Sequence, residues 1–143
     1  MPFGPLDMGK ITFVLFVASG LAQTINPLVG TWQRVADSPA PPAVLFFGAD
    51  GYYAQIAIPT GRSKPKNDFD HMTREELMKQ FGGVRASYGI YKVSGTKLTR
   101  KLTASVNPGS EGTEMVQQFR IQGDDLVLKT VDEKAESRFR RMR

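Results

Sequence analysis

Short runs of alternating apolar and polar residues recur along most of this chain. They are rich in β-branched and aromatic residues, and glycine, proline, asparagine or aspartate separates them. An alternation of period two puts successive side chains on opposite faces of a strand. The pattern therefore predicts strands at residues 31–35, 43–47, 52–58, 85–93, 97–106, 115–121, 126–130 and 136–141.

Most connections between these runs are short and contain glycine, which favours hairpins between antiparallel neighbours. Residues 59–71 are the exception, a long polar stretch that we expect to be an exposed loop. About eight strands are needed before a sheet can close into a barrel that holds side chains or one small ligand. The predicted fold class is therefore all-β, an eight-stranded antiparallel barrel with one short helix.

The helix is expected to begin at Thr73. Thr73 and Glu76 have the spacing of a capping box, in which each side chain binds a backbone amide of the other residue. Leu77, Met78 and Phe81 provide an apolar side, and two glycines that follow can end the helix. Two placements are open: a lid over the barrel mouth, or a connector that plugs one end.

The N-terminal part of the chain predicts an export signal. Lys10 precedes an apolar run, residues 11–22, that ends in small residues. This run is too short to span a bilayer, which takes about 20 apolar residues. We expect cleavage after Ala22, a secreted or periplasmic protein, and a barrel domain at residues 23–143. The alternative is that residues 11–22 form a buried element of the fold.

Composition narrows the possible chemistry. The chain has 143 residues, no cysteine, one histidine and a net charge of +5, which suit one domain and exclude thiolate chemistry and disulfides. No metal site is expected, because His71 has no second histidine or any cysteine to join it. Basic residues are scattered apart from residues 138–143, so no nucleic-acid partner is expected. No cofactor is expected, and no stable membrane insertion once the signal is removed.

Period two, counted from Trp32, predicts which side chains face the lumen. Arg34 then points inward with Trp32. With the apolar residues of each strand setting its inward face, the same rule selects three further groups along the chain: Tyr53 and Gln55; Leu98, Arg100 and Leu102; and Gln117, Phe119 and Ile121. Two arginines inside a barrel need carboxylates or an anionic ligand. The alternative is a bulge that shifts the register and turns one or both arginines toward solvent.

Several segments together resemble the bacterial and fungal lipocalin-like domain family: Leu28-Val-Gly-Thr-Trp32, Gly51-Tyr-Tyr-Ala-Gln-Ile56, Thr73-Arg-Glu-Glu76, Tyr88-Gly-Ile-Tyr91, Asn107-Pro108 and Gly123-Asp-Asp-Leu126. The resemblance covers residues 27–143 and implies an eight-stranded calycin barrel. It also implies a structural arginine that packs over Trp32, which Arg140 or Arg141 could provide. Family members often carry a histidine in the fifth strand, where this chain has Arg100.

Three functions are compatible with these features. The first is a carrier or sensor of a small, partly apolar molecule, with an anionic headgroup at Arg34 and Arg100 and a tail among Phe47, Tyr91 and Phe119. The second is a cofactor-free isomerase, cyclase or dehydratase that uses Tyr53, Tyr91 or His71 for proton transfer and Arg100 for an oxyanion. The third is a filled barrel that acts through its basic C-terminus. The expected ligand-binding residues are Arg34, Tyr53, Gln55, Tyr91, Arg100, Gln117 and Phe119.

Overall fold

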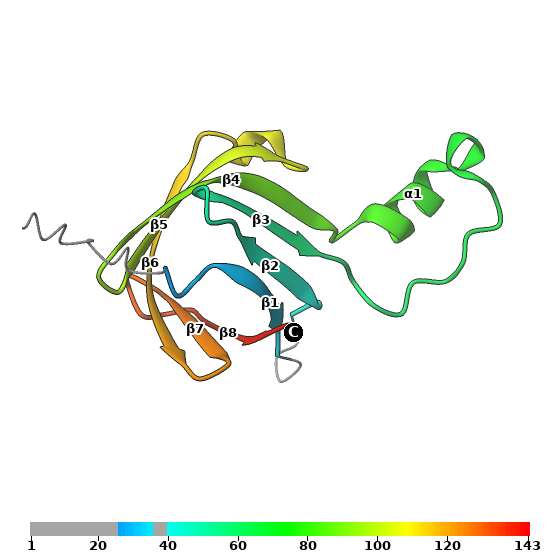
Figure 1. The fold of residues 1–143 in the computed structure, drawn as a ribbon. Coiled ribbons are helices and arrows are strands. Elements are labelled where there is room, and N and C mark those ends of the chain that lie inside the picture. Colours follow the sequence, from blue (N-terminus) through cyan, green and yellow to red (C-terminus); the bar gives the residue numbers. More distant parts are fainter. Residues whose placement is uncertain (1–25, 36–39) are drawn as a thin grey trace, which may run out of the picture.

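The computed structural model describes residues 26–35 and 40–143, and within them eight strands form one closed antiparallel barrel (Figure 1). Each strand pairs with the next along the chain, and the last pairs with the first. This confirms the predicted fold class. The strands are β1 (Gly30–Arg34), β2 (Ala43–Phe47), β3 (Tyr52–Ala57), β4 (Arg85–Ser94), β5 (Lys97–Ser105), β6 (Glu114–Gln122), β7 (Asp125–Thr130) and β8 (Glu136–Arg141).

The predicted strand limits agree with these to within one residue at every end. The differences lie next to turns, where one hydrogen bond more or fewer lengthens or shortens a strand by one residue. This does not change which side chains face inward. The expected export signal, residues 1–22, lies outside the described residues. The barrel domain is described from residue 26 onward.

Apolar side chains fill the end of the barrel at which β1 begins. The buried cluster includes Leu28, Trp32, Phe47 and Tyr91, together with leucines and phenylalanines of β2 and β5 to β8. Trp32 is completely buried, and its indole Nε1 donates to the carbonyl oxygen of Leu28 at 2.8 Å. We call this end the floor, because Trp32 closes it.

Arg141 is the arginine that packs over Trp32. Its guanidinium carbon lies 4.1 Å from the centre of the indole ring, and the group donates to the carbonyl oxygens of Val29 and Pro27, at 2.9 Å each. Arg140 points outward instead and pairs with Asp125. Assigning this role to Arg140 is therefore wrong. Successive residues of a strand point to opposite faces, so Arg140 points away from the face of the buried Phe139, whereas Arg141 lies on the same face as Phe139.

A bulge between β4 and β5 lies on the mouth side of Arg100. Tyr91 pairs with Arg100 and Gly89 with Leu102, but Tyr88 pairs with Ala104, so Thr103 is the extra residue. A side chain at Gly89 would place a Cβ 1.9 Å from the carbonyl oxygen of Lys101, so this close approach requires glycine. Because the shift comes after Arg100, this arginine keeps the inward direction that period two predicts.

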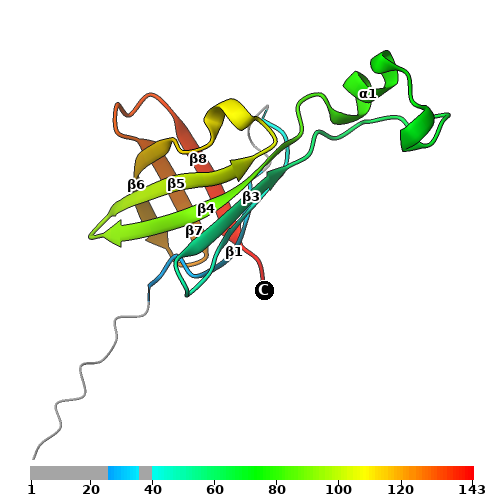
Figure 2. The same ribbon diagram turned by 90° about the horizontal axis from the view of Figure 1, so that it is seen from above.

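The segment between β3 and β4, residues 58–84, extends away from the barrel as an arm (Figures 1 and 2). It contains a 3-10 turn (η1, Phe69–His71) and the helix α1 (Arg74–Phe81), neither of which has a buried residue. The rings of Phe69 and Phe81 meet edge to face, 5.6 Å apart. In this structure α1 is therefore neither a lid on the mouth nor a plug in the barrel.

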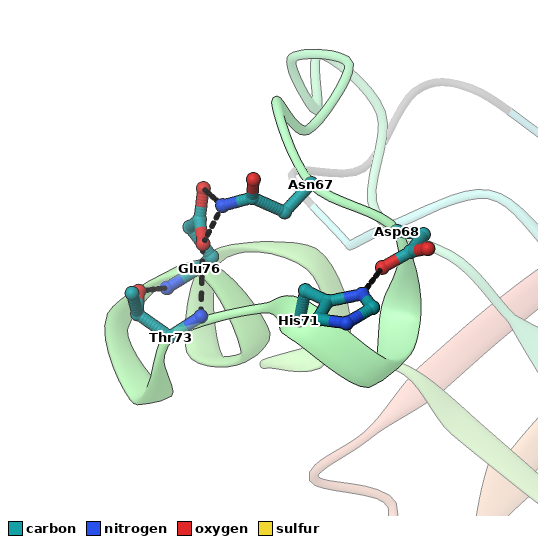
Figure 3. Close-up of polar contacts among 5 residues, drawn as sticks. All are labelled: Asn67, Asp68, His71, Thr73 and Glu76. Carbon is teal, nitrogen blue, oxygen red and sulfur yellow. Dashed lines mark hydrogen bonds and ion pairs between the residues drawn. The ribbon is translucent and has the colours of Figure 1, made fainter.

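The expected capping box is present at the start of α1 (Figure 3). The backbone amide of Thr73 donates to Oε2 of Glu76 at 2.8 Å, and the backbone amide of Glu76 donates to the Thr73 hydroxyl at 3.2 Å. Asn67 also donates to the Glu76 carboxylate. The bond from Thr73, and then that from Asn67, holds the pKa of Glu76 below its usual range.

The capping box should make α1 sensitive to acid. A carboxylate with a lowered pKa stabilises the helix start above the ordinary glutamate range, and this contribution disappears as the pH falls through the lowered pKa. We expect the amide resonance of Thr73 to move with a midpoint below about pH 4.3, the usual glutamate value. An NMR titration measures this. In Glu76→Gln, the Thr73 resonance should stay constant over the same range; equal titration in both proteins contradicts the assignment.

Candidate functional site

A cavity of about 350 Å3 opens at the end of the barrel from which the arm leaves. We call this end the mouth. The residues of the cavity that carry the argument below are Tyr53 and Gln55 of β3, Ser87 of β4, Arg100 and Leu102 of β5, and Met115 of β6. Residues 83–86 at the base of the arm and the β5–β6 connection complete its walls. The volume lies near the lower limit for small-molecule sites.

Arg100 is the charged group of this cavity. Only 5 % of its surface is exposed, and it donates to Oε1 of Gln117 at 2.5 Å, to Oε1 of Gln55 at 3.1 Å and to the sulfur of Met115 at 3.2 Å. Its Nε has no hydrogen-bond partner among the described residues. A guanidinium has five N–H donors, so the hydrogen-bonding capacity of this one is not fully used within the described residues.

The ion pairs of the described residues contain none to Arg100. Burial lowers the pKa of Arg100 from its usual value, and the neighbouring Tyr53 opposes this effect. A buried charge without a partner of opposite sign costs several kcal/mol, which neutral amide oxygens offset only in part. The cavity therefore presents a partly satisfied positive charge that an anion would neutralise.

Tyr53 lies directly beside this charge. The guanidinium carbon of Arg100 is 5.3 Å from the centre of the Tyr53 ring, in a cation–π contact. The Tyr53 hydroxyl is buried and has no hydrogen-bond partner among the described residues. Burial raises the pKa of Tyr53, although the charge of Arg100 acts in the opposite direction. At neutral pH the hydroxyl is therefore protonated and can donate to a bound oxygen atom.

Tyr91 has a different environment at the floor. Its hydroxyl donates to the carbonyl oxygen of Gly48 at 2.7 Å and accepts from Asn26 at 3.0 Å. Its ring packs edge to face on Phe47, 4.9 Å away. Burial, and then the charge of Asp50, raises the pKa of Tyr91. Tyr91 thus joins the N-terminal turn to the β2–β3 turn, and these contacts give it a structural role.

The two tyrosines should respond differently to loss of the hydroxyl. Tyr53→Phe removes an unpaired buried group, so the free energy of unfolding should stay the same or rise by up to about 1 kcal/mol. Tyr91→Phe breaks two hydrogen bonds and should lower it by about 1–2 kcal/mol. Urea denaturation of both variants measures the difference. Equal losses would mean that the Tyr53 hydroxyl also has a structural partner.

The structure brings four of the expected ligand-binding residues together around one charge: Tyr53, Gln55, Arg100 and Gln117. Gln117 is buried and does not line the cavity. Its contribution is to accept a hydrogen bond from Arg100 and so to hold the guanidinium in place. Phe119 lies in the floor cluster with Tyr91 and Phe47. The side chains expected to surround an apolar tail therefore fill the barrel rather than line its cavity.

Arg34 and His71 lie elsewhere. The guanidinium of Arg34 is 5.6 Å from the ring centre of Phe139 and donates to the carbonyl oxygen of Pro41. It lines a separate, more open hollow of about 500 Å3, so Arg34 and Arg100 do not share a cavity. His71 is exposed on the arm, and its Nδ1 bonds to Asp68 (Figure 3). The lining of the Arg100 cavity does not include it.

Most of the lining residues are not among the expected ones, and Ser87 and Met115 are two examples from the strands. Met115 lies two residues before Gln117 on β6, so the period that selected Gln117 also places it inward. Ser87 lies two residues before the buried Gly89 on β4. Both lie near the ends of strands. Neither residue has the strong apolar character or the charge that would mark its position as inward in the sequence.

The described residues contain no cluster of three or more histidine, cysteine, aspartate or glutamate side chains that could bind a metal. In the same part of the chain, no helix has the length and apolar character needed to cross a membrane.

Comparisons with known proteins return structures only. No protein-family model and no curated protein sequence matches the chain. One similar structure is an uncharacterized protein from Bacteroides eggerthii DSM 20697, with 15% identity, coverage of 80% of this chain and 99% of that chain, and a TM-score of 0.46. Another is a variant of the fluorescent protein UnaG, with 17% identity, coverage of 80% and 96%, and a TM-score of 0.35. The case for a function therefore depends on the cavity itself.

Proposed function

We propose that this protein binds a small, partly apolar molecule with an anionic group in the cavity at the barrel mouth. The observation that carries the proposal is the buried Arg100, which has no ion-pair partner among the described residues and does not use all of its N–H donors there. Charge-assisted hydrogen bonds from a guanidinium to a carboxylate are among the strongest in proteins. The anionic group lies against Arg100 and the Tyr53 hydroxyl.

The rest of the cavity suits a short apolar body rather than a long chain. Leu102, Val84, Val106 and Met115 contribute apolar surface to its walls. The floor cluster ends the lumen with Trp32, Phe47 and Tyr91, so a ligand enters only the mouth half. This places Arg34 outside the binding site and reduces the proposed contacts to those around Arg100.

A matched pair of probes tests the charge requirement. Phenylpropanoate and the nearly isosteric phenylpropanamide present the same apolar body, one with and one without a negative charge. Isothermal titration calorimetry should give at least about tenfold tighter binding of the acid, equivalent to about 1.4 kcal/mol. Equal affinities for acid and amide would contradict an anionic ligand.

A second candidate function follows from the contact between Tyr53 and Arg100. A protonated phenol beside a buried guanidinium can donate a proton while the guanidinium stabilises a developing oxyanion. This would serve a cofactor-free isomerase, cyclase or dehydratase. Tyr53→Phe distinguishes the two functions, because it would abolish turnover of an enzyme's substrate but weaken simple anion binding only a few-fold.

The proposed location is outside the cytoplasm, secreted or periplasmic, and its support is the apolar run at residues 11–22. Mass spectrometry of the mature protein from the exported fraction should find an N-terminus at Gln23. An intact Met1 or Met8 in that fraction would contradict cleavage after Ala22.

A further inference from the structure

The outer surface of β2, β3 and β4 is apolar, although outward positions of a barrel in water are usually polar. We call this surface the β2–β4 face. It consists of seven outward residues that neighbour one another across the paired strands: Val44, Phe46, Tyr52, Ala54, Ile56, Tyr88 and Ile90. None of the seven carries a charge. Strands β2, β3 and β4 lie side by side (Figure 1), so their paired outward residues form one contiguous apolar patch.

The large side chains of this face are unusually exposed. Phe46, Tyr52 and Tyr88 have 47 %, 56 % and 52 % of their surface in contact with solvent, and Ile56 has 50 %. A contiguous exposed apolar patch of several hundred Å2 is often functional, for example as an interaction surface.

Polar residues border the face on both sides. On β1, Thr31 pairs with Phe46 and Gln33 with Val44. On β5, Lys101 pairs with Ile90. An apolar centre with a polar border is the usual composition of a protein–protein interface.

Lys92 of β4 and Lys101 of β5 lie at the edge of the face, and further charged residues lie on the opposite strands. The outward positions of β6, β7 and β8 carry Arg120, Lys129, Arg138 and Arg140, with Asp125 and Glu136 among them. In the closed barrel, β7 is four strands from β3 in either direction. Surfaces that bind anionic membranes combine apolar residues with many lysines and arginines. The β2–β4 face itself contains no basic residue, which favours a protein partner for it.

The area of the face fits a dimer interface. A half-exposed aromatic side chain presents about 100 Å2, and together with the aliphatic residues the face presents roughly 500 Å2 of apolar surface. A standard interface buries about 800 Å2 on each partner, of which about 65% is apolar in homodimers. The β2–β4 face alone therefore supplies the apolar share that one subunit of a homodimer needs.

We propose that the β2–β4 face binds the same face of a second copy of this chain, in a twofold-symmetric dimer. Because no position of the face is charged, the two copies meet through uncharged residues, and Lys92 and Lys101 stay at the border of the contact. The charged residues of β6 to β8 on the two barrels then lie farthest apart. A twofold interface uses one patch on both subunits, so a single apolar face is sufficient. The proposal is independent of the ligand in the mouth.

Sedimentation velocity of the purified protein tests this directly. One chain has a mass of 15.8 kDa, so the dimer should have twice that mass at about 100 µM, a concentration well above the roughly micromolar Kd expected of an interface of this size. A single-chain mass at this concentration would overturn the proposal. A protein that stays monomeric but floats with neutral phosphatidylcholine vesicles would instead assign the face to lipid.

Two variants locate the interface. Ile56→Lys places a charge on the middle strand of the face, β3, between β2 and β4, and should shift the protein to monomer by raising the Kd at least about 100-fold. Val131→Lys places the same charge on an apolar residue of the β7–β8 turn that is 62 % exposed, and should leave the dimer unchanged. Circular dichroism checks that both variants fold. A dimer in Ile56→Lys, or equal dissociation of both variants, overturns the proposal.

Discussion

Arg100→Met is expected to remove binding of the anionic probe while making the free protein more stable. Affinity should fall at least about 100-fold, because the charge that attracts the anion is gone. The free energy of unfolding should rise by about 1–2 kcal/mol, because a buried charge without a partner is replaced by an apolar side chain of similar length. The gain is limited because Gln55 and Gln117 lose their donor. Calorimetry and urea denaturation measure the two effects.

Lys101→Met is the matched control for this variant. Lys101 is the next residue of β5, and its exposed side chain points away from the lumen. The same substitution there should change neither the affinity for phenylpropanoate nor the stability by more than about 0.5 kcal/mol. A large loss of stability in Arg100→Met would mean that the guanidinium is a structural group, and unchanged affinity would place the anion elsewhere.

Trp32→Ala should lower the free energy of unfolding by about 3–5 kcal/mol, the usual cost of truncating a large aromatic side chain in a core. Trp32 is fully buried, its indole donates to Leu28, and Arg141 covers its ring. All three interactions are lost together. The shift of the urea midpoint measures this effect.

Phe69→Ala is a suitable comparison for Trp32→Ala, because Phe69 lies on the arm and is 64 % exposed. Its removal should cost less than about 0.5 kcal/mol. If Trp32→Ala shifted the midpoint no more than Phe69→Ala, the floor would not be held by the tryptophan.

The strands were predictable because alternation of period two is a local property of the chain. Once the apolar residues of each strand indicated its inward face, alternation placed Tyr53, Gln55 and Arg100 on that face, where the structure has them. The bulge does not disturb this count at Arg100, because the extra residue comes later on β5. The same alternation within β8 would also have distinguished Arg141, which lies on the face of Phe139, from Arg140, which lies on the opposite face.

Distances across the barrel were not predictable in this way. Arg34 and Arg100 both face inward by their period, but their strands are far apart around the barrel, and the side chains reach different hollows. The position of α1 was also undetermined, since the capping box defines where a helix begins and not where it packs. These features depend on contacts between residues far apart in the sequence, and the alternation within one strand gives no information about such contacts.

An NMR titration of the arginine side chains tests the central claim most directly. The Nε–H group of Arg100 is buried, so its resonance should be protected from exchange with water and visible beside the exposed arginines. As phenylpropanoate is added to the protein, this resonance should shift and saturate with the Kd measured by calorimetry, while that of Arg34 stays in place. A saturable shift at Arg34 or Arg141 with no change at Arg100 would contradict anion binding in the barrel mouth.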